Sequence, residues 1–390
     1  MYKKKIIKNL ILVLVFLLSI AFSCRAASGI YEYPQIYRDA GVAAQGGAAV
    51  ATITGISSVF YNPAGLAFTP KSEGWDVNFP VINFGLSTKV LDFVNDFQDK
   101  VLSDSVTDKE KAVFDLLEEY MGDTFSGEGE FLFGIGKKFE SVGLGLGVFV
   151  RGSLSGCVHE GFGSVGILDI KSYNFGGAFA GLGLSFFQNK VHLGADVKVL
   201  YGGVINHAFT ASEIINHADN FDDYVKDNIL TKGTAVTGDV GIIITPWKKS
   251  FLNPSFGISL TNIGDVKINS EKVIPQTLNV GAAINPKIFE GGTHFQNTRF
   301  EIDIRDITKN YEEDQDWGKR LYIGGATDLI KYSHFTLTLR GGFYQGYPSY
   351  GVEFHLFAFD FQFVSYATEV GKYAGQTENR RYMVSLAIRW

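Results

Sequence analysis

The 390-residue chain carries 35 Lys and Arg against 41 Asp and Glu, and this acidic balance, a formal net charge of −6, argues against nucleic-acid binding. Glycine (45 residues) and aromatic residues (14%) are abundant for a soluble domain, whereas charged residues make up only 19%. The two cysteines, Cys24 and Cys157, exclude a disulfide framework. This composition is typical of an outer-membrane barrel, although soluble β-sandwiches share part of it.

The N-terminus has the layout of a secretory signal peptide. Four lysines within the first eight residues precede an apolar run at 10–22 and then small residues. The apolar run is shorter than the roughly 20 residues that a membrane-spanning helix needs. We expect cleavage near Ala26 or Ala27, which removes residues 1–26. Alternatively, residues 21–24 form a loose lipobox, and Cys24 becomes a lipidated N-terminus.

The stretch 41–68 differs from everything that follows it. Small residues crowd its first half, it contains no lysine or aspartate, and it closes on the sequence Asn-Pro-Ala-Gly-Leu at 62–66. Pro63 fixes its own φ and favours an extended Asn62, while Gly65 permits a turn. Such a compact, nearly uncharged stretch suits a confined space in which backbone packs against backbone.

From residue 73 onward, apolar and polar residues alternate with the period of two that is typical of β-strands. At the C-terminus, Tyr382, Val384, Leu386, Ile388 and Trp390 share one face. The opposite faces of the strands often carry Gly, Ser or Thr, as at 143, 145 and 147, which favours a confined lumen over bulk water. We predict fourteen strands, an even number as bacterial barrels require. They lie at 73–88, 129–140, 142–153, 171–187, 190–204, 234–247, 252–262, 275–286, 296–307, 318–330, 334–345, 349–357, 359–368 and 380–390.

The predicted connections alternate between long and short. If the first strand begins on the periplasmic side, the long connections lie on the extracellular side, at 89–128, 154–170, 205–233 and 263–274. Short turns such as 140–141 then lie on the periplasmic side. Barrels of the outer membrane have this arrangement of long and short connections. The change of phase at Phe357-Ala358 predicts a tight turn, with a bulge as the alternative. Thr107 and Glu110 predict a capping box for one helix in the first outer loop, and Ser212 predicts the start of another in 205–233.

The sequence shows no catalytic or metal-binding pattern. The seven histidines are scattered, and neither a His-Glu-x-x-His motif nor a Gly-x-Ser-x-Gly motif is present. Asp303, Arg305 and Asp306 form a charged group, but alternation along a lumen-facing strand explains them. We therefore expect neither an enzyme nor a bound cofactor.

The small-residue run that ends in S-S-V-F-Y-N-P-A-G-L-A resembles the N-terminal hatch of the FadL-like outer-membrane proteins, a group that includes long-chain fatty-acid transporters and barrels associated with type IX secretion. The stretch I-P-Q-T-L-N-V-G-A-A-I-N-P at 274–286 and the C-terminal end R-Y-M-V-S-L-A-I-R-W also resemble that family. The resemblance implies a hatch at 27–71 that plugs a barrel formed by 72–390, in the outer membrane of a diderm bacterium. It implies that Asn62, Pro63, Ala64 and Gly65 form the gate, with Phe60, Tyr61, Leu66 and Phe68 as apolar ligand contacts.

Two functions follow from this resemblance. The first is passive uptake of a hydrophobic small molecule, such as a long-chain fatty acid, past the hatch, and the second is a binding platform for secreted or surface proteins. An ordinary diffusion porin needs an open lumen, which the hatch argues against. The partners we expect are an apolar ligand, outer-membrane lipid and the barrel-assembly machinery, which would read the C-terminal strand that ends at Trp390. The landing groove of the fatty-acid transporters cannot be transferred, because the longest loop here follows the first strand.

Overall fold

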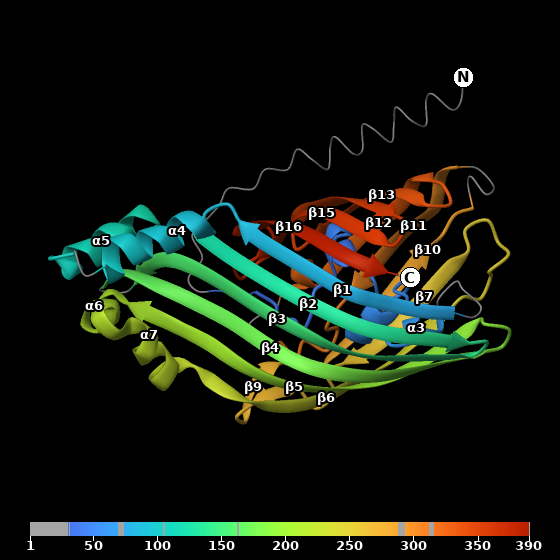
Figure 1. Ribbon diagram of the computed structural model, residues 1–390, viewed down its shortest axis with the longest axis horizontal. Coiled ribbons are helices and arrows are strands. Elements are labelled where there is room, and N and C mark those ends of the chain that lie inside the picture. The colour runs from blue at the N-terminus through green and yellow to red at the C-terminus, as the bar shows by residue number, and fades with distance from the viewer. Residues whose placement is uncertain are drawn as a thin grey trace, which may run out of the picture.

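The computed structural model describes residues 30, 32–68, 74–103, 106–161, 164–287, 293–311 and 316–389. Fourteen antiparallel strands form one closed barrel, in which β16 pairs with both β1 and β15 (Figure 1). The fold class and the number of strands predicted from the alternation are confirmed. The predicted signal peptide, Cys24 and Trp390 lie outside the described residues.

Each predicted strand overlaps one strand of the barrel, and the connection at Phe357-Ala358 is the predicted turn. The barrel strands are β1 (Gly74–Ser87), β2 (Thr124–Phe139), β3 (Val142–Gly161), β4 (Ser164–Phe186), β5 (Val191–Thr210), β6 (Thr231–Ile244), β7 (Pro254–Thr261), β10 (Thr277–Ile284), β11 (His294–Ile304), β12 (Leu321–Lys331), β13 (Phe335–Tyr344), β14 (Tyr347–Leu356), β15 (Phe359–Glu369) and β16 (Glu378–Arg389).

The alternation separates a lipid-facing surface from a lumen. On β3, Leu144, Leu146 and Val148 are exposed on the outside, whereas Gly143 and Gly145 face the lumen. Because the strands on all sides carry apolar residues outward, the barrel has the surface of a membrane protein. A closed barrel satisfies its own backbone hydrogen bonds and is the architecture of outer-membrane proteins, so the outer-membrane location is confirmed. Among the described residues, no helix is both long and apolar enough to cross a bilayer.

One end of the barrel continues far beyond the membrane. β3, β4 and β5 contain 20, 23 and 20 residues, about twice the length that a membrane-spanning strand needs. The predicted loop 154–170 was therefore wrong over most of its length, because the described residues on either side of 162–163 continue the strands. The prediction failed because both faces of this extension meet water or protein rather than lipid, so no lipid-driven alternation marks it.

Helices lie at this end of the barrel (Figure 1) and pack against the outward-facing side of the extension, because the strand residues that they contact, Phe125 and Phe209, lie on the same strand faces as the exposed Phe131 and Tyr201. Their apolar side chains, including Phe93, Leu116 and Ile214, form one buried cluster with Phe125 of β2 and Phe209 of β5. The helical elements are α4 (Val90–Asp96), η2 (Phe97–Leu102), α5 (Lys109–Glu119), α6 (Ala211–His217), η3 (Ala218–Asn220), α7 (Phe221–Tyr224) and η4 (Val225–Ile229). The short helix η5 (Trp317–Arg320) precedes β12 in a separate outer connection.

Both predicted helix starts were displaced. Asp108, rather than Thr107, caps α5 by accepting from Lys111 N, and Thr210, rather than Ser212, caps α6 by accepting from Glu213 N. In each case another residue that can cap a helix lies one or two positions earlier or later, where the chain turns into the helix.

The predicted outer loop 263–274 contains a small hairpin. Its strands are β8 (Val266–Ile268) and β9 (Glu271–Ile274), which form a separate two-stranded sheet. Val266, Ile268 and Ile274 are buried in the same apolar cluster as Leu200 of β5 and Ala235 of β6. The hairpin therefore covers the inner face of β5 and β6 and narrows the lumen above the N-terminal segment.

The N-terminal segment 32–68 crosses the inside of the barrel. Its helices are α2 (Ala40–Ala44), η1 (Ile56–Phe60) and α3 (Gly65–Phe68). α2 packs against β13 to β16, whereas α3 packs against β2 to β5 on the other side of the lumen. We call these residues the hatch segment. The predicted boundary at 71–72 lies outside the described residues, so the division into domains stays a prediction.

Candidate functional site

Asn62 fixes the hatch segment to the barrel wall. Its fully buried side-chain nitrogen donates to Val50 O (2.8 Å) within the segment and to Ile242 O (3.2 Å) of β6 and Ile258 O (3.4 Å) of β7. Its side-chain oxygen accepts from Ala64 N at 3.2 Å. Asn62 therefore connects two halves of the hatch segment and two strands of the barrel at one point.

Glycines in the strands make this close approach possible. A Cβ atom at Gly241 would lie 2.0 Å from Asn62 Oδ1, one at Gly194 would lie 2.1 Å from Pro63 C, and one at Gly143 would lie 2.2 Å from Leu66 O. Gly65 follows the turn closed by its own N–H donating to Asn62 O, its φ is not positive, and a Cβ there would lie 2.5 Å from Ile53 O within the hatch segment. The predicted packing of backbone against backbone thus occurs between the hatch segment and the wall.

Two carboxylates of β11 hold the middle of the hatch segment. Asp303 Oδ2 accepts from the backbone N–H groups of Ala49 (2.7 Å) and Val50 (2.9 Å), and Glu301 Oε1 accepts from Ala51 N at 2.6 Å. These three hydrogen bonds to backbone N–H groups anchor the segment to β11. Sequence analysis placed Asp303 on the lumen face but did not predict that it binds the hatch segment.

A buried network of charges fixes the start of the hatch segment. Glu32 Oε2 accepts from Arg381 of β16 at 2.6 Å, and Arg38 lies 3.6 Å from both Glu32 and Glu128 of β2. Arg151 of β3 completes the group, 3.1 Å from Glu128. Although burial alone would raise the pKa of Glu32, Arg381 and Arg38 lower it to about 2. Glu32 therefore remains ionised at any ordinary pH.

An aromatic group lies between this network and the Asn62 turn. Phe60 packs against Tyr37 of the hatch segment and against Phe149 of β3 and Phe179 of β4, with ring centroids 4.7, 5.3 and 5.6 Å apart. Phe60 and Tyr61 also line a small cavity of about 60 Å³. This volume holds no substrate of useful size, so the described conformation is closed at this level.

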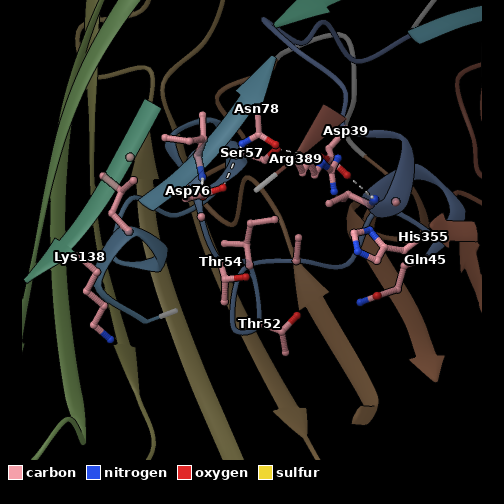
Figure 2. Close-up of a pocket in the computed structure, with 18 of the residues that line it drawn as sticks. Asp39, Gln45, Thr52, Thr54, Ser57, Asp76, Asn78, Lys138, His355 and Arg389 are labelled. Carbon is pink, nitrogen blue, oxygen red and sulfur yellow. Dashed lines mark hydrogen bonds between the residues drawn. The ribbon is translucent and has the colours of Figure 1, made fainter. Parts of the chain in front are cut away.

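A larger cavity lies on the other side of the hatch segment, toward the short turns. Its volume is about 660 Å³, and residues 52–57 of the hatch segment form one wall (Figure 2). The other walls come from β1, β2, β11, β13, β14 and β16, including Asp76, His355 and Arg389. We call this cavity the vestibule. The predicted topology places its opening in the periplasm.

The structure brings most of the predicted site residues to the boundary between the hatch segment and the wall. Asn62, Ala64 and Gly65 are buried there, Phe60 and Tyr61 face the small cavity, and Leu66 lines the vestibule. Phe68 instead packs edge-on against His192 of β5. Their roles as gate and ligand contacts stay predictions. Within the described ranges, no group of three or more His, Cys, Asp or Glu side chains is placed to hold a metal ion.

Among solved structures, the toluene transporter TbuX of Ralstonia pickettii matches this chain with a TM-score of 0.50 at 10% sequence identity, over 90% of this chain and 98% of TbuX. A deletion variant of the monoaromatic hydrocarbon channel TodX matches with a TM-score of 0.51 at 10% identity, over 90% and 98% of the two chains. The chain has the FadL-like fold. The fold that the sequence resemblance implied is thus confirmed. No known family profile matches the sequence, and no curated protein matches it.

Proposed function

We propose that this chain is an outer-membrane transporter through which hydrophobic small molecules, and long-chain fatty acids in particular, diffuse passively past the hatch segment. We propose no enzymatic activity for it. The observation that carries the proposal is the filled lumen: residues 32–68 bind the wall through Asn62, Glu301, Asp303 and the Glu32 network. A porin for small polar solutes would need this space to be open.

The side chains that line the lumen also support an apolar substrate. Above the hatch segment, the lumen is lined by an apolar cluster that includes Phe149, Phe175, Phe179 and Leu200 and that extends to the β8–β9 hairpin. Aromatic and aliphatic side chains of this kind dominate binding sites for apolar molecules. The fold shared with the toluene transporter TbuX and the monoaromatic hydrocarbon channel TodX agrees with this class of substrate.

A binding platform for secreted or surface proteins is the second candidate, and the tall outer extension favours it. In β3 to β5, strands of 20 or more residues carry the helices α4 to α7 well clear of the membrane. Their apolar stripes are used in packing against the strands rather than in forming an open landing groove. The exposed surface of the extension is thus available for protein contact.

Gentle purification followed by mass spectrometry of the extracted lipid tests the first proposal. We expect a stoichiometric apolar or amphipathic ligand, and cells that lack the protein should take up labelled fatty acid more slowly than cells that contain it. A stoichiometric protein partner, with no bound ligand and no effect on uptake, would replace the transporter with the platform.

A further inference from the structure

The vestibule has a polar lining whose acceptors are already engaged. Asp39 accepts hydrogen bonds from Val42 N (3.1 Å) and Ser57 Oγ (2.8 Å), and Asp76 accepts from Ile56 N at 3.0 Å (Figure 2). Both carboxylates therefore serve to hold the hatch segment in place.

Donors, in contrast, are in excess. Arg299 donates one hydrogen bond, from Nε to Gln45 Oε1 at 3.1 Å, and Arg389 Nε lies 3.3 Å from Asp360 Oδ2. A guanidinium has five N–H donors, and the described residues offer the terminal nitrogens of these two arginines no hydrogen-bond acceptor. His355 likewise uses only Nδ1, which lies 2.6 Å from Asp360 Oδ1.

The positive charges are also gathered on one side of the vestibule. The guanidinium groups of Arg299, Arg340 and Arg389 all act electrostatically on the single carboxylate of Glu353. Glu353 is bonded directly to Arg340, and Arg389 faces Asp360 through Nε, so the terminal nitrogens of Arg299 and Arg389 remain as donors for another anion. Arginine binds carboxylates through two parallel N–H donors, so a carboxylate fits this arrangement better than a neutral molecule does.

The remaining lining is apolar. Val42, Ile53, Ile56 and Leu66 of the hatch segment line the same cavity, whose volume of about 660 Å³ lies within the range of small-molecule sites. We propose that the vestibule binds a carboxylate-bearing amphiphile, with Arg299 and Arg389 donating to its carboxylate and these apolar residues contacting its chain. This inference rests on the proposed function, since the ligand is the molecule that the barrel delivers to the periplasmic side.

Binding to the purified full-length protein in a non-ionic detergent tests the inference, with labelled dodecanoate as the probe. Arg299→Gln and Arg389→Gln should each weaken dodecanoate binding about tenfold or more, because each removes a charge-assisted hydrogen bond. Arg380→Gln is the matched control, since Arg380 donates instead to Ser365 Oγ and Pro348 O, outside the vestibule. It should leave the affinity unchanged.

Two further ligands, dodecanol and dodecyl phosphate, show which head group the vestibule binds. Dodecanol should bind more weakly than dodecanoate and should respond to neither vestibule substitution. Equal binding of dodecanol and dodecanoate, or dodecanoate affinity that survives both substitutions, would overturn the proposal. Dodecyl phosphate that binds about tenfold more tightly than dodecanoate would overturn the carboxylate assignment and indicate a phosphate-bearing amphiphile.

A substitution that changes no charge tests the vestibule even if the arginine variants do not fold. Thr54 lines the vestibule, and Thr54→Phe should fill part of it and reduce dodecanoate binding while the barrel keeps its heat-modifiable migration on a gel. Unchanged binding in that variant would contradict the site. If uptake depends on the protein but the vestibule variants bind dodecanoate normally, the inference fails while the proposed function stands. If uptake does not depend on the protein, the proposed function itself fails.

Discussion

Asn62→Ala should release the hatch segment from the wall. The substitution removes the donor to Val50 O, Ile242 O and Ile258 O and the acceptor of Ala64 N. Only the bonds to Ile242 O and Ile258 O join the segment to the wall, and a buried hydrogen bond contributes roughly 1 kcal/mol, so we expect a loss of about 1–2 kcal/mol in the free energy that holds the segment closed. At 1.4 kcal/mol per factor of ten, the open population should rise roughly 5- to 30-fold.

Conductance in planar lipid bilayers measures this population directly. The variant should show frequent openings that the wild type lacks, at an unchanged level of assembled barrel. Asn228→Ala is the matched control, because, among the residues that the structure describes, the Asn228 side chain donates only to Tyr224 O on the exposed α7–η4 surface. If Asn62→Ala conducts no more than Asn228→Ala, the Asn62 contacts do not hold the hatch segment, and the reasoning about the glycine-lined wall is wrong.

Four further predictions concern assembly, topology and gating. Ala64→Trp should overfill a fully buried position and lower fatty-acid uptake at normal protein level; normal uptake would contradict a path past this turn. Deleting Met383–Trp390 should prevent barrel closure, since β16 pairs with both β1 and β15, and heat-modifiable migration retained by the truncation would refute this. Protease added to intact cells should cut within 89–123 but not at the turn 187–190, and the reverse pattern would invert the topology. The lowered pKa of Glu32 stabilises the hatch segment fully above about pH 4.3 and progressively less as the pH falls toward 2, so bilayer conductance should rise over that interval and Glu32→Gln should abolish the rise.

The barrel could be predicted because lipid imposes a strict pattern on each strand. Leu144, Leu146 and Val148 must face outward while Gly143 and Gly145 face the hatch segment, and this period of two is visible without any structure. The same argument explains why every predicted strand overlaps one strand of the barrel.

Features away from the lipid escaped prediction. The extension of β3 to β5 and the β8–β9 hairpin lie where both faces meet water or protein, so no alternation of lipid and lumen marks them. The partners of lumen charges also depend on contacts between residues far apart in sequence. Glu32 and Arg381 are 349 positions apart, and only the closed barrel brings them together.

Uptake of a labelled long-chain fatty acid by cells with a lockable hatch segment tests the central claim most directly. A Cβ atom at Gly281 of β10 would lie 3.0 Å from Val50 Cβ and 2.2 Å from Asp303 Oδ1, so Val50→Cys with Gly281→Cys should form a disulfide once the Asp303 side chain has moved aside and the backbone has shifted slightly. The remaining described cysteine, Cys157, is buried. We predict that the oxidised double variant takes up no more fatty acid than cells without the protein and that a reductant restores uptake. Equal uptake by the oxidised and reduced forms, above that of cells lacking the protein, would contradict passage past the hatch segment.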